Sequence, residues 1–263
     1  MKRHITTATF CLIVLAALVA GFNHTSSSFA LSTTLTPPPE NTEPQPLIVW
    51  TSYDPWRMVI GSDSPRFALY DDGQVIYYDI DEEGYVAVKL SEDELSELIE
   101  PLALDEFANL DDYYEASDWT DQQSHLFYVW LDGEQKQVGV YGDPTLDEVR
   151  AELPDALLAV YDRLAAFEHP NAEAWLPEKI EVLIWPYETS GGAEWPADWP
   201  GLDDPDTVER YEDHYSLFLD TKDFEEFRAL MDEASGVAVI DGRTWAVSYR
   251  YPFPQEQLWM VAQ

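Results

Sequence analysis

Three Asp-Gly dipeptides constrain the fold of this chain more than any other feature, because each one joins two segments with strand-like patterns. Glycine accepts a positive φ at little cost, so Asp-Gly suits the two-residue turn of a β-hairpin. The dipeptides are Asp72-Gly73, Asp132-Gly133 and Asp241-Gly242. Strands that arrive in adjacent pairs predict antiparallel sheets, whereas a doubly wound parallel sheet would need a regular alternation of strand and helix.

Helix signals follow the hairpins. Ser91 and Glu94 have the spacing of a capping box, and apolar residues continue at helical spacing through Leu95, Leu98, Ile99 and Leu102. Thr145 and Glu148 predict a second capping box, and Pro154 is expected to start a new helix after a break. We therefore expect an α+β fold, in which antiparallel sheets of Asp-Gly-turned hairpins are each covered on one face by amphipathic helices.

Other segments extend this pattern. Strands are expected at residues 47–53 and 57–60, and the acidic segment 109–123 is too polar for a core, so it is predicted to be a surface loop. Beyond Trp175, strands are expected at 178–186 and 214–219, and a helix is expected to begin at Thr221. The predicted folded domains are 47–175 and a smaller α+β domain or extension at 176–263.

Composition narrows the possible partners. The 263 residues are 46% hydrophobic and 14% aromatic, which is enough for one large core or two small ones. Against 51 Asp and Glu there are only 14 Lys and Arg, and the net charge of −37 repels phosphate. The sequence therefore argues against nucleic acid and anionic membrane surfaces as partners, while cationic or neutral partners fit.

The N-terminal residues have the features of a signal peptide. A basic start at Lys2 and Arg3 precedes a short apolar run, and Ser28-Phe29-Ala30 provides small residues for cleavage after Ala30. We predict a signal peptide at 1–30, a Ser/Thr/Pro-rich linker at 31–46, and secretion to the periplasm, cell envelope or exterior with no membrane contact in the mature form. An uncleaved short anchor is the alternative. The single cysteine, Cys11, lies inside the predicted signal peptide, so the mature chain would have no disulfide.

A set of short motifs resembles a family of uncharacterised exported bacterial domains. These are F-x-L-Y-D-D-G-x-V-I-Y from Phe67, L-S-x-x-E-L from Leu90, H-x-F-x-V from His125, V-x-V-Y-G from Val138 and L-P-x-x-L from Leu153. The resemblance covers about residues 67–167. The segment W-x-P-E-K-I-E-V and the later Trp-Pro pairs extend it toward residue 200. It implies an exported α+β scaffold and carries no activity.

Candidates for catalysis are few. Beyond the predicted signal peptide the histidines are His125, His169 and His214, widely separated, and the chain has no nucleophile elbow, His-Glu-x-x-His helix or phosphate-binding glycine loop. A spatial triad is still possible in principle. A secreted hydrolase that uses a carboxylate pair, or an isolated histidine such as His125 or His214, is therefore kept as the alternative function.

One acidic fragment resembles the opening of a calcium loop. Asp79, Asp81 and Glu83 alternate ahead of Gly84, as oxygen ligands do in an EF-hand. The twelfth position is Leu90 instead of a bidentate glutamate, and strands are expected on both sides. A plain acidic turn is the favoured interpretation, and we predict no metal and no cofactor.

Trp195 and Trp199 lie in a loop rich in proline, glycine and aspartate. Flat rings on a constrained loop can stack on sugar rings or fill a partner's pocket, but they can equally fold back on the sheet as a small satellite core. We predict a non-enzymatic binding module, with an unidentified protein or glycan as its partner and these two tryptophans as the contact.

Overall fold

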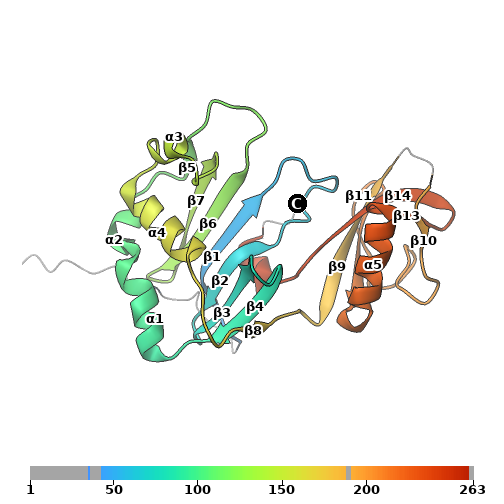
Figure 1. Ribbon diagram of the computed structural model, residues 1–263, viewed down its shortest axis with the longest axis horizontal. Helices are drawn as coiled ribbons and strands as arrows, with labels where there is room; N and C mark the ends of the chain where they lie inside the picture. Colours follow the sequence, from blue (N-terminus) through green and yellow to red (C-terminus); the bar gives the residue numbers. More distant parts are fainter. Residues whose placement is uncertain (1–34, 36–42, 188–190, 261–263) are drawn as a thin grey trace, which may run out of the picture. The chain divides into compact units, whose positions relative to one another are not determined.

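The computed structural model describes residue 35, residues 43–187 and residues 191–260 (Figure 1). The predicted signal peptide and most of the predicted linker lie outside these described residues. All of the described residues belong to one compact unit. Within this unit, one sheet uses residues 46–174 and a second uses residues 179–250. The division into two domains at 175/176 stays a prediction.

The first sheet has eight strands in the order β5-β7-β6-β1-β2-β3-β4-β8. Its neighbours pair antiparallel except at one edge, where β5 runs parallel to β7. β1 therefore lies in the middle and pairs with both β2 and β6. The strands are β1 (Pro46–Tyr53), β2 (Pro65–Tyr70), β3 (Gln74–Asp79), β4 (Gly84–Lys89), β5 (Tyr113–Glu115), β6 (Ser124–Leu131), β7 (Glu134–Tyr141) and β8 (Glu173–Ala174).

The second sheet has six strands in the order β10-β13-β14-β9-β12-β11. Here too one edge strand, β10, is parallel to its neighbour β13. The predicted α+β class is thus confirmed. The sheets are mixed and not purely antiparallel, because each has one short edge strand, β5 or β10, that pairs parallel with its neighbour. The strands are β9 (Lys179–Pro186), β10 (Ala193–Glu194), β11 (Val208–Tyr211), β12 (His214–Asp220), β13 (Val237–Ile240) and β14 (Arg243–Arg250).

The Asp-Gly turns connect β2 to β3, β6 to β7 and β13 to β14. In the last two, aspartate and glycine both have positive φ, as in Asp132 (52°) and Gly133 (85°). Gly73 has a further reason to be glycine. A Cβ atom there would lie 2.9 Å from the carbonyl oxygen of Leu90, whose amide donates to the carbonyl of Gly73.

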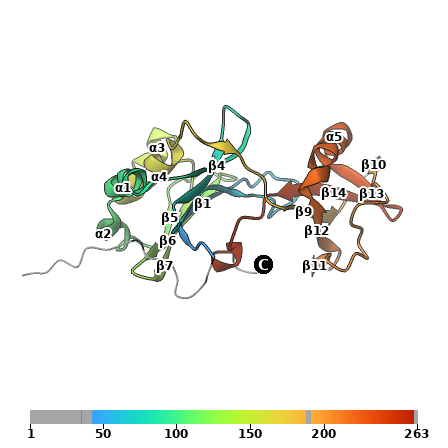
Figure 2. The same cartoon turned by 90° about the horizontal axis from the view of Figure 1, so that it is seen from below.

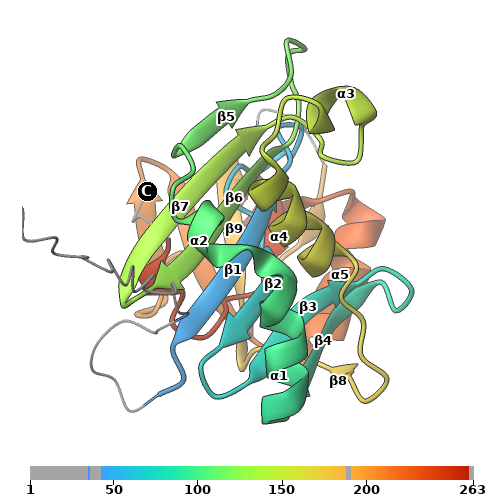
Figure 3. The ribbon, with the colours of Figure 1, turned by 90° about the vertical axis from the view of Figure 1, so that its left-hand side faces the viewer.

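Helices lie across one face of the first sheet (Figure 3). In α1, both halves of the Ser91–Glu94 capping box are present, so the amides of Ser91 and Glu94 each have a side-chain acceptor. Buried residues of α1 and α4 then pack with the inner face of the sheet in one core. The helices are α1 (Glu92–Ile99), α2 (Leu104–Phe107), α3 (Asp147–Arg150), α4 (Asp155–Ala165) and, beside the second sheet, α5 (Phe224–Ala234), with short 3₁₀ turns η1 (Glu100–Leu102), η2 (Thr221–Asp223) and η3 (Glu256–Leu258).

The capping box predicted at Thr145 is wrong. Asp143 accepts hydrogen bonds from both the amide (2.9 Å) and the hydroxyl (2.7 Å) of Thr145. The hydroxyl is therefore engaged away from the helix, Leu146 takes the N-cap position without a side-chain cap, and α3 lasts only one turn. The next helix, α4, begins after Pro154, as predicted.

Two other local predictions also need correction. Residues 57–60 form no strand, because the segment is folded into turns in which Arg57 donates to Asp63 (2.6 Å) and Ser62 to the carbonyl of Val59 (2.7 Å). The segment predicted as a loop at 109–123 contains β5. Tyr113 can lie against β7 there because Gly139 has no side chain: a Cβ atom would be 3.0 Å from the tyrosine ring.

The opposite face of the first sheet is covered by the C-terminal segment, residues 251–260 (Figure 2). Phe253 and Trp259 pack on this face with residues of β1, β2, β3, β4 and β6. The hydroxyl of Tyr70 donates to the carbonyl of Pro254 (3.0 Å), and the amide of Tyr251 donates to Ser64 Oγ (2.7 Å). Central strands of the first sheet are therefore buried on both faces. Among the described residues, no helix has the length and apolarity needed to cross a membrane.

Candidate functional site

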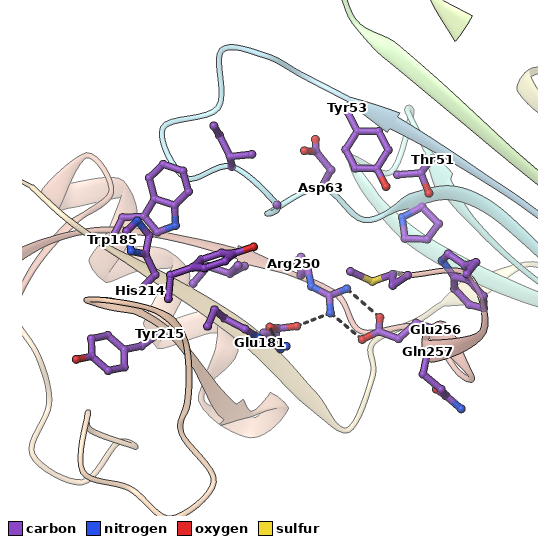
Figure 4. A pocket seen from close by; sticks show the side chains of 18 residues that line it. Thr51, Tyr53, Asp63, Glu181, Trp185, His214, Tyr215, Arg250, Glu256 and Gln257 are labelled. Atoms are coloured by element: carbon purple, nitrogen blue, oxygen red, sulfur yellow. Dashed lines mark hydrogen bonds and ion pairs between the residues drawn. The ribbon is translucent and has the colours of Figure 1, made fainter. Parts of the chain in front are cut away.

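A cavity of about 530 Å³ collects aromatic side chains around a small group of buried charges. We call it the aromatic pocket. Both sheets contribute to it, since its walls come from the end of β1, the loop after β1, the strands β9, β11 and β12, and the C-terminal segment (Figure 4). Its lining includes Ile60, Glu181, Trp185, Arg210, Tyr211, His214, Arg250 and Glu256, and Ser216 is hydrogen-bonded to Glu181 beneath it.

The alternation of β9 places its side chains on two faces. Ile180, Val182 and Ile184 point into the core of the second sheet. Glu181, Leu183 and Trp185 are on the other face, where all three line the aromatic pocket. A strand with period two thus supplies one charge and two apolar side chains to the pocket wall.

The floor of the pocket is an ion-pair network. Arg250, only 4% exposed, donates to both oxygens of Glu256, at 2.7 and 2.8 Å, and forms an ion pair with Glu181, which is 2% exposed (Figure 4). The other oxygen of Glu181 accepts from Arg210 (2.9 Å) and from the hydroxyl of Ser216 (2.6 Å). Two arginines and two glutamates therefore neutralise one another.

Electrostatics keep this network ionised. Burial alone would raise the pKa of Glu181, but Arg250, the Ser216 hydroxyl and Arg210 outweigh burial and hold that pKa below its ordinary value. Burial likewise opposes the charge on Arg250, yet Glu256 and Glu181 raise the pKa of the guanidinium. A glycosidase acid needs a raised pKa, so the lowered pKa of Glu181 is the opposite of what that role requires.

Aromatic rings form the wall nearest to solvent. Trp185 and His214 are in edge contact, with ring centroids 4.9 Å apart, and Tyr211 lies 6.0 Å from His214. Tyr211 is 55% exposed, and Ile60, which comes from the loop after β1, is also exposed. Since the charges below are already paired, what the pocket offers to a molecule entering it is mainly apolar and aromatic surface.

The predicted contact residues Trp195 and Trp199 lie elsewhere. Their rings are in edge contact, 5.1 Å between centroids, and both pack against Phe227 of α5. Trp199 is only 7% exposed, and Trp195 donates its ring N–H to the carbonyl of Pro200 (2.9 Å). This placement is the satellite core that we gave as the alternative. It gives no support to the binding role, which stays a prediction.

The three histidines have different surroundings. His169 contacts the carboxylate of Glu94 (3.2 Å). His214 lies in the aromatic pocket, with Nδ1 2.7 Å from the carbonyl oxygen of Glu212. His125 is buried in the first sheet, where burial lowers its pKa to about 4, with Asp143 opposing that shift and Arg66 adding to it. The structure does not bring these histidines together into one site.

Asp79, Asp81 and Glu83 form the turn between β3 and β4. Asp79 Oδ1 accepts from the amides of Asp81 (2.9 Å) and Glu82 (3.1 Å), so this carboxylate serves the turn itself. Within the described part of the chain, no group of three or more His, Cys, Asp or Glu residues has the arrangement of a metal site.

Comparison with known proteins concerns the first sheet. Residues 64–168 match the family model of a domain of unknown function, DUF6438. The match covers less than half of the chain and runs from the start of β2 to just beyond α4. No curated protein and no solved structure matches this chain. Of the described residues that line the aromatic pocket, Pro65 alone falls within the DUF6438 segment, so the pocket belongs to the remainder of the chain.

Sequence reasoning missed the residues of the pocket floor. Glu181 interrupts an apolar strand segment, and Arg250 stands among aromatic residues at the end of another. A charge in such a position signals a buried ion pair, because an unpaired charge in a core is too costly. The two charged residues were visible in the sequence, but the sequence did not reveal that Glu181 and Arg250 pair with each other.

Proposed function

We propose that this chain is an exported binding protein, and that the aromatic pocket holds an uncharged ligand with a flat apolar ring face. A sugar ring and an aromatic side chain of a protein partner both have such a face. The observation that carries the proposal is the pairing of the pocket's floor charges with one another, which leaves aromatic and apolar walls as the contact surface.

The walls support this ligand class. Trp185, Tyr211 and His214 provide ring surface, and rigid aromatic side chains lose little conformational entropy on binding. The net charge of −37 also favours a neutral ligand over an anionic one for a site near the surface. The sequence prediction was a binding module that makes contact through Trp195 and Trp199. The present proposal keeps the binding function but assigns the contact to the aromatic pocket.

The test is a binding screen with a glycan array and a set of uncharged aromatic fragments and peptides. For each ligand found, Tyr211→Ala should weaken binding about tenfold, or about 1.4 kcal/mol, by isothermal titration calorimetry. Tyr113→Ala is the matched control, since Tyr113 is 58% exposed on an edge strand of the other sheet and does not line the pocket. Equal affinity of the two variants would contradict the proposal, and turnover in a hydrolase panel would favour the alternative function.

Export has its own test. Terminal sequencing of protein from the culture medium or periplasm is expected to begin near Leu31. An intact chain that begins at Met1 and accumulates in the cytosol would refute it.

A further inference from the structure

A second cavity, of about 690 Å³, lies around Arg66 and Arg228. We call it the arginine pocket. Its walls come from β1 and the loop after it, and from β2, β3, β4, β6, α4, α5 and β14. Most of its lining residues belong to the DUF6438 segment, in contrast to the aromatic pocket. Its lining includes Arg66, Arg228, His125, Tyr78, Tyr85 and Tyr251.

Arg66 and Arg228 have no carboxylate partner and no hydrogen-bond acceptor within the described part of the chain. Arg66 instead lies over the ring of Tyr78, 4.5 Å from its centroid, and Arg228 lies 5.8 Å from the centroid of Phe224. Every other arginine among the described residues donates to a carboxylate or a carbonyl; these are Arg57, Arg150, Arg163, Arg210, Arg243 and Arg250.

The contrast is significant because acids outnumber bases so strongly in this chain. With 51 Asp and Glu against 14 Lys and Arg, a guanidinium has many potential partners. Arg66 and Arg228 line the same cavity and have no carboxylate partner among the described residues. Their planar N–H donors are therefore available to another group. The ring of Tyr78 also holds the Arg66 guanidinium by a cation–π contact, which limits its freedom before a ligand arrives.

The carboxylates in the same cavity are mostly engaged. Asp63 accepts from Arg57 (2.6 Å), Asp54 accepts from the amide of Trp56 (2.9 Å), and Asp143 accepts from Thr145. The fourth, Glu83, is exposed on the turn between β3 and β4. The acidic residues therefore do not neutralise Arg66 and Arg228, although they will limit affinity for an anion.

His125 supplies an independent observation. It is 3% exposed and lines the arginine pocket, and its Nδ1 accepts from the ring N–H of Trp50 (3.2 Å). An indole N–H can only donate, so the proton of the neutral imidazole is on Nε2. That Nε2 is buried and has no partner among the described residues. A buried unpaired donor is costly unless an acceptor reaches it.

We propose that the arginine pocket binds an organic oxyanion, a carboxylate or phosphate group carried on a flat body. Arg66 and Arg228 bind the oxygens, the N–H at Nε2 of His125 donates within the same cavity, and the rings of Tyr78, Tyr85 and Tyr251 face the body of the ligand. This site is separate from the aromatic pocket and does not depend on its proposed function.

The experiment uses benzoate as the probe, with inorganic phosphate as a second arm and neutral benzamide as the isosteric control. Titrations are made by calorimetry and by NMR of the His125 ring nitrogens, at constant ionic strength set with sodium chloride because of the acidic surface. We expect benzoate to bind saturably with a dissociation constant of about 1 mM, and benzamide to bind at least about tenfold more weakly. Phosphate binding without benzoate binding would show that the flat body has been assigned wrongly and would overturn that part.

Variants locate the site. Arg66→Gln and Arg228→Gln should each weaken benzoate binding about tenfold, because each removes a charge-assisted hydrogen-bond donor. Lys222→Gln is the matched control: it removes the same charge from the chain, is exposed, and lies outside both pockets. If Arg66→Gln binds benzoate as wild type does, or if wild type binds neither probe, the proposal is overturned.

Discussion

The two cavities use arginine in opposite ways. In the aromatic pocket, Arg210 and Arg250 are held by Glu181 and Glu256, so the charges are part of the structure. In the arginine pocket, Arg66 lies over the ring of Tyr78 and forms no ion pair with any described residue. The comparison teaches that the number of charges lining a cavity says little about its ligand. What matters is how many of those charges the fold has already paired.

The largest expected effect on stability comes from breaking the ion pairs of the aromatic pocket. Arg250→Met would leave two carboxylates, one of them fully buried, without their common partner, and should lower the free energy of unfolding by about 3–5 kcal/mol. Lys179→Met, which breaks an exposed pair with Asp206, should cost no more than about 1 kcal/mol. Chemical denaturation measures both. A similar cost for the two variants would remove the distinction between buried and exposed pairs.

A smaller effect should follow from the pH dependence of His125. Its pKa is lowered to about 4 in the folded chain, whereas an unfolded histidine has a pKa near 6.5, so the unfolded state takes up the proton first as the pH falls. Stability from this residue is complete above about pH 6.5 and is lost as the pH falls toward 4, by roughly 2–3 kcal/mol.

The measurement is urea denaturation from pH 7 down to pH 4, with wild type compared with His125→Gln. The variant should lose less stability over this interval, since glutamine does not titrate, while its amide oxygen can still accept from Trp50. His214→Gln is the control, because that ring is only half buried. Parallel pH profiles for wild type and His125→Gln would show that the buried imidazole does not cause the loss of stability at low pH.

Ser216 gives a graded version of the first prediction. It is fully buried, donates to Glu181 (2.6 Å) and accepts from Arg210 (3.0 Å), so Ser216→Ala should cost about 1–2 kcal/mol. The exposed Ser96, which donates to the carbonyl of Glu92, is the comparison, and Ser96→Ala should change stability by less than about 0.5 kcal/mol. Thermal unfolding followed by circular dichroism would show an equal shift for both if the network contributed nothing.

The smallest effect on stability is expected in the arginine pocket. Arg66→Gln removes a cation–π contact and no ion pair, so the free energy of unfolding should fall by no more than about 1 kcal/mol. Denaturation under the same conditions as for Arg250→Met makes the comparison direct. A loss as large as that of Arg250→Met would mean that Arg66 is a structural residue, whatever its ligand.

The local elements of this fold were accessible from the sequence. The Asp-Gly turns, the Ser91–Glu94 cap and the break at Pro154 act within a few residues, and the structure has hairpins and helices there. The Thr145 cap failed for an equally local reason, because Asp143 competes for the same hydroxyl. Composition could not decide whether Trp195 and Trp199 face a partner or the core, since aromatic rings serve both purposes.

The cavities were not accessible in this way. Glu181, Arg250 and Glu256 come together only because β9 pairs with β14 and the chain then turns back over the first sheet. Likewise, Arg66 and Arg228 come from β2 and α5, and nothing in their sequence neighbourhoods relates them. Such sites depend on long-range pairing, which a single sequence does not reveal through periodicity.

The position of β1 and of the C-terminal segment has a consequence for how the chain reaches its native state. β1 must wait for β6, and residues 251–260 pack on the far face of the same sheet, so segments far apart in the sequence are needed to finish the first sheet. Contacts so distant along the chain form slowly, because loop closure must precede their stabilisation. Until residues 251–260 are in place, that face of β1, β2 and β6 is open, with Tyr70, Tyr128 and Trp130 available for aggregation. Docking of residues 251–260, and not the formation of any single hairpin, therefore determines when this face of the first sheet is covered.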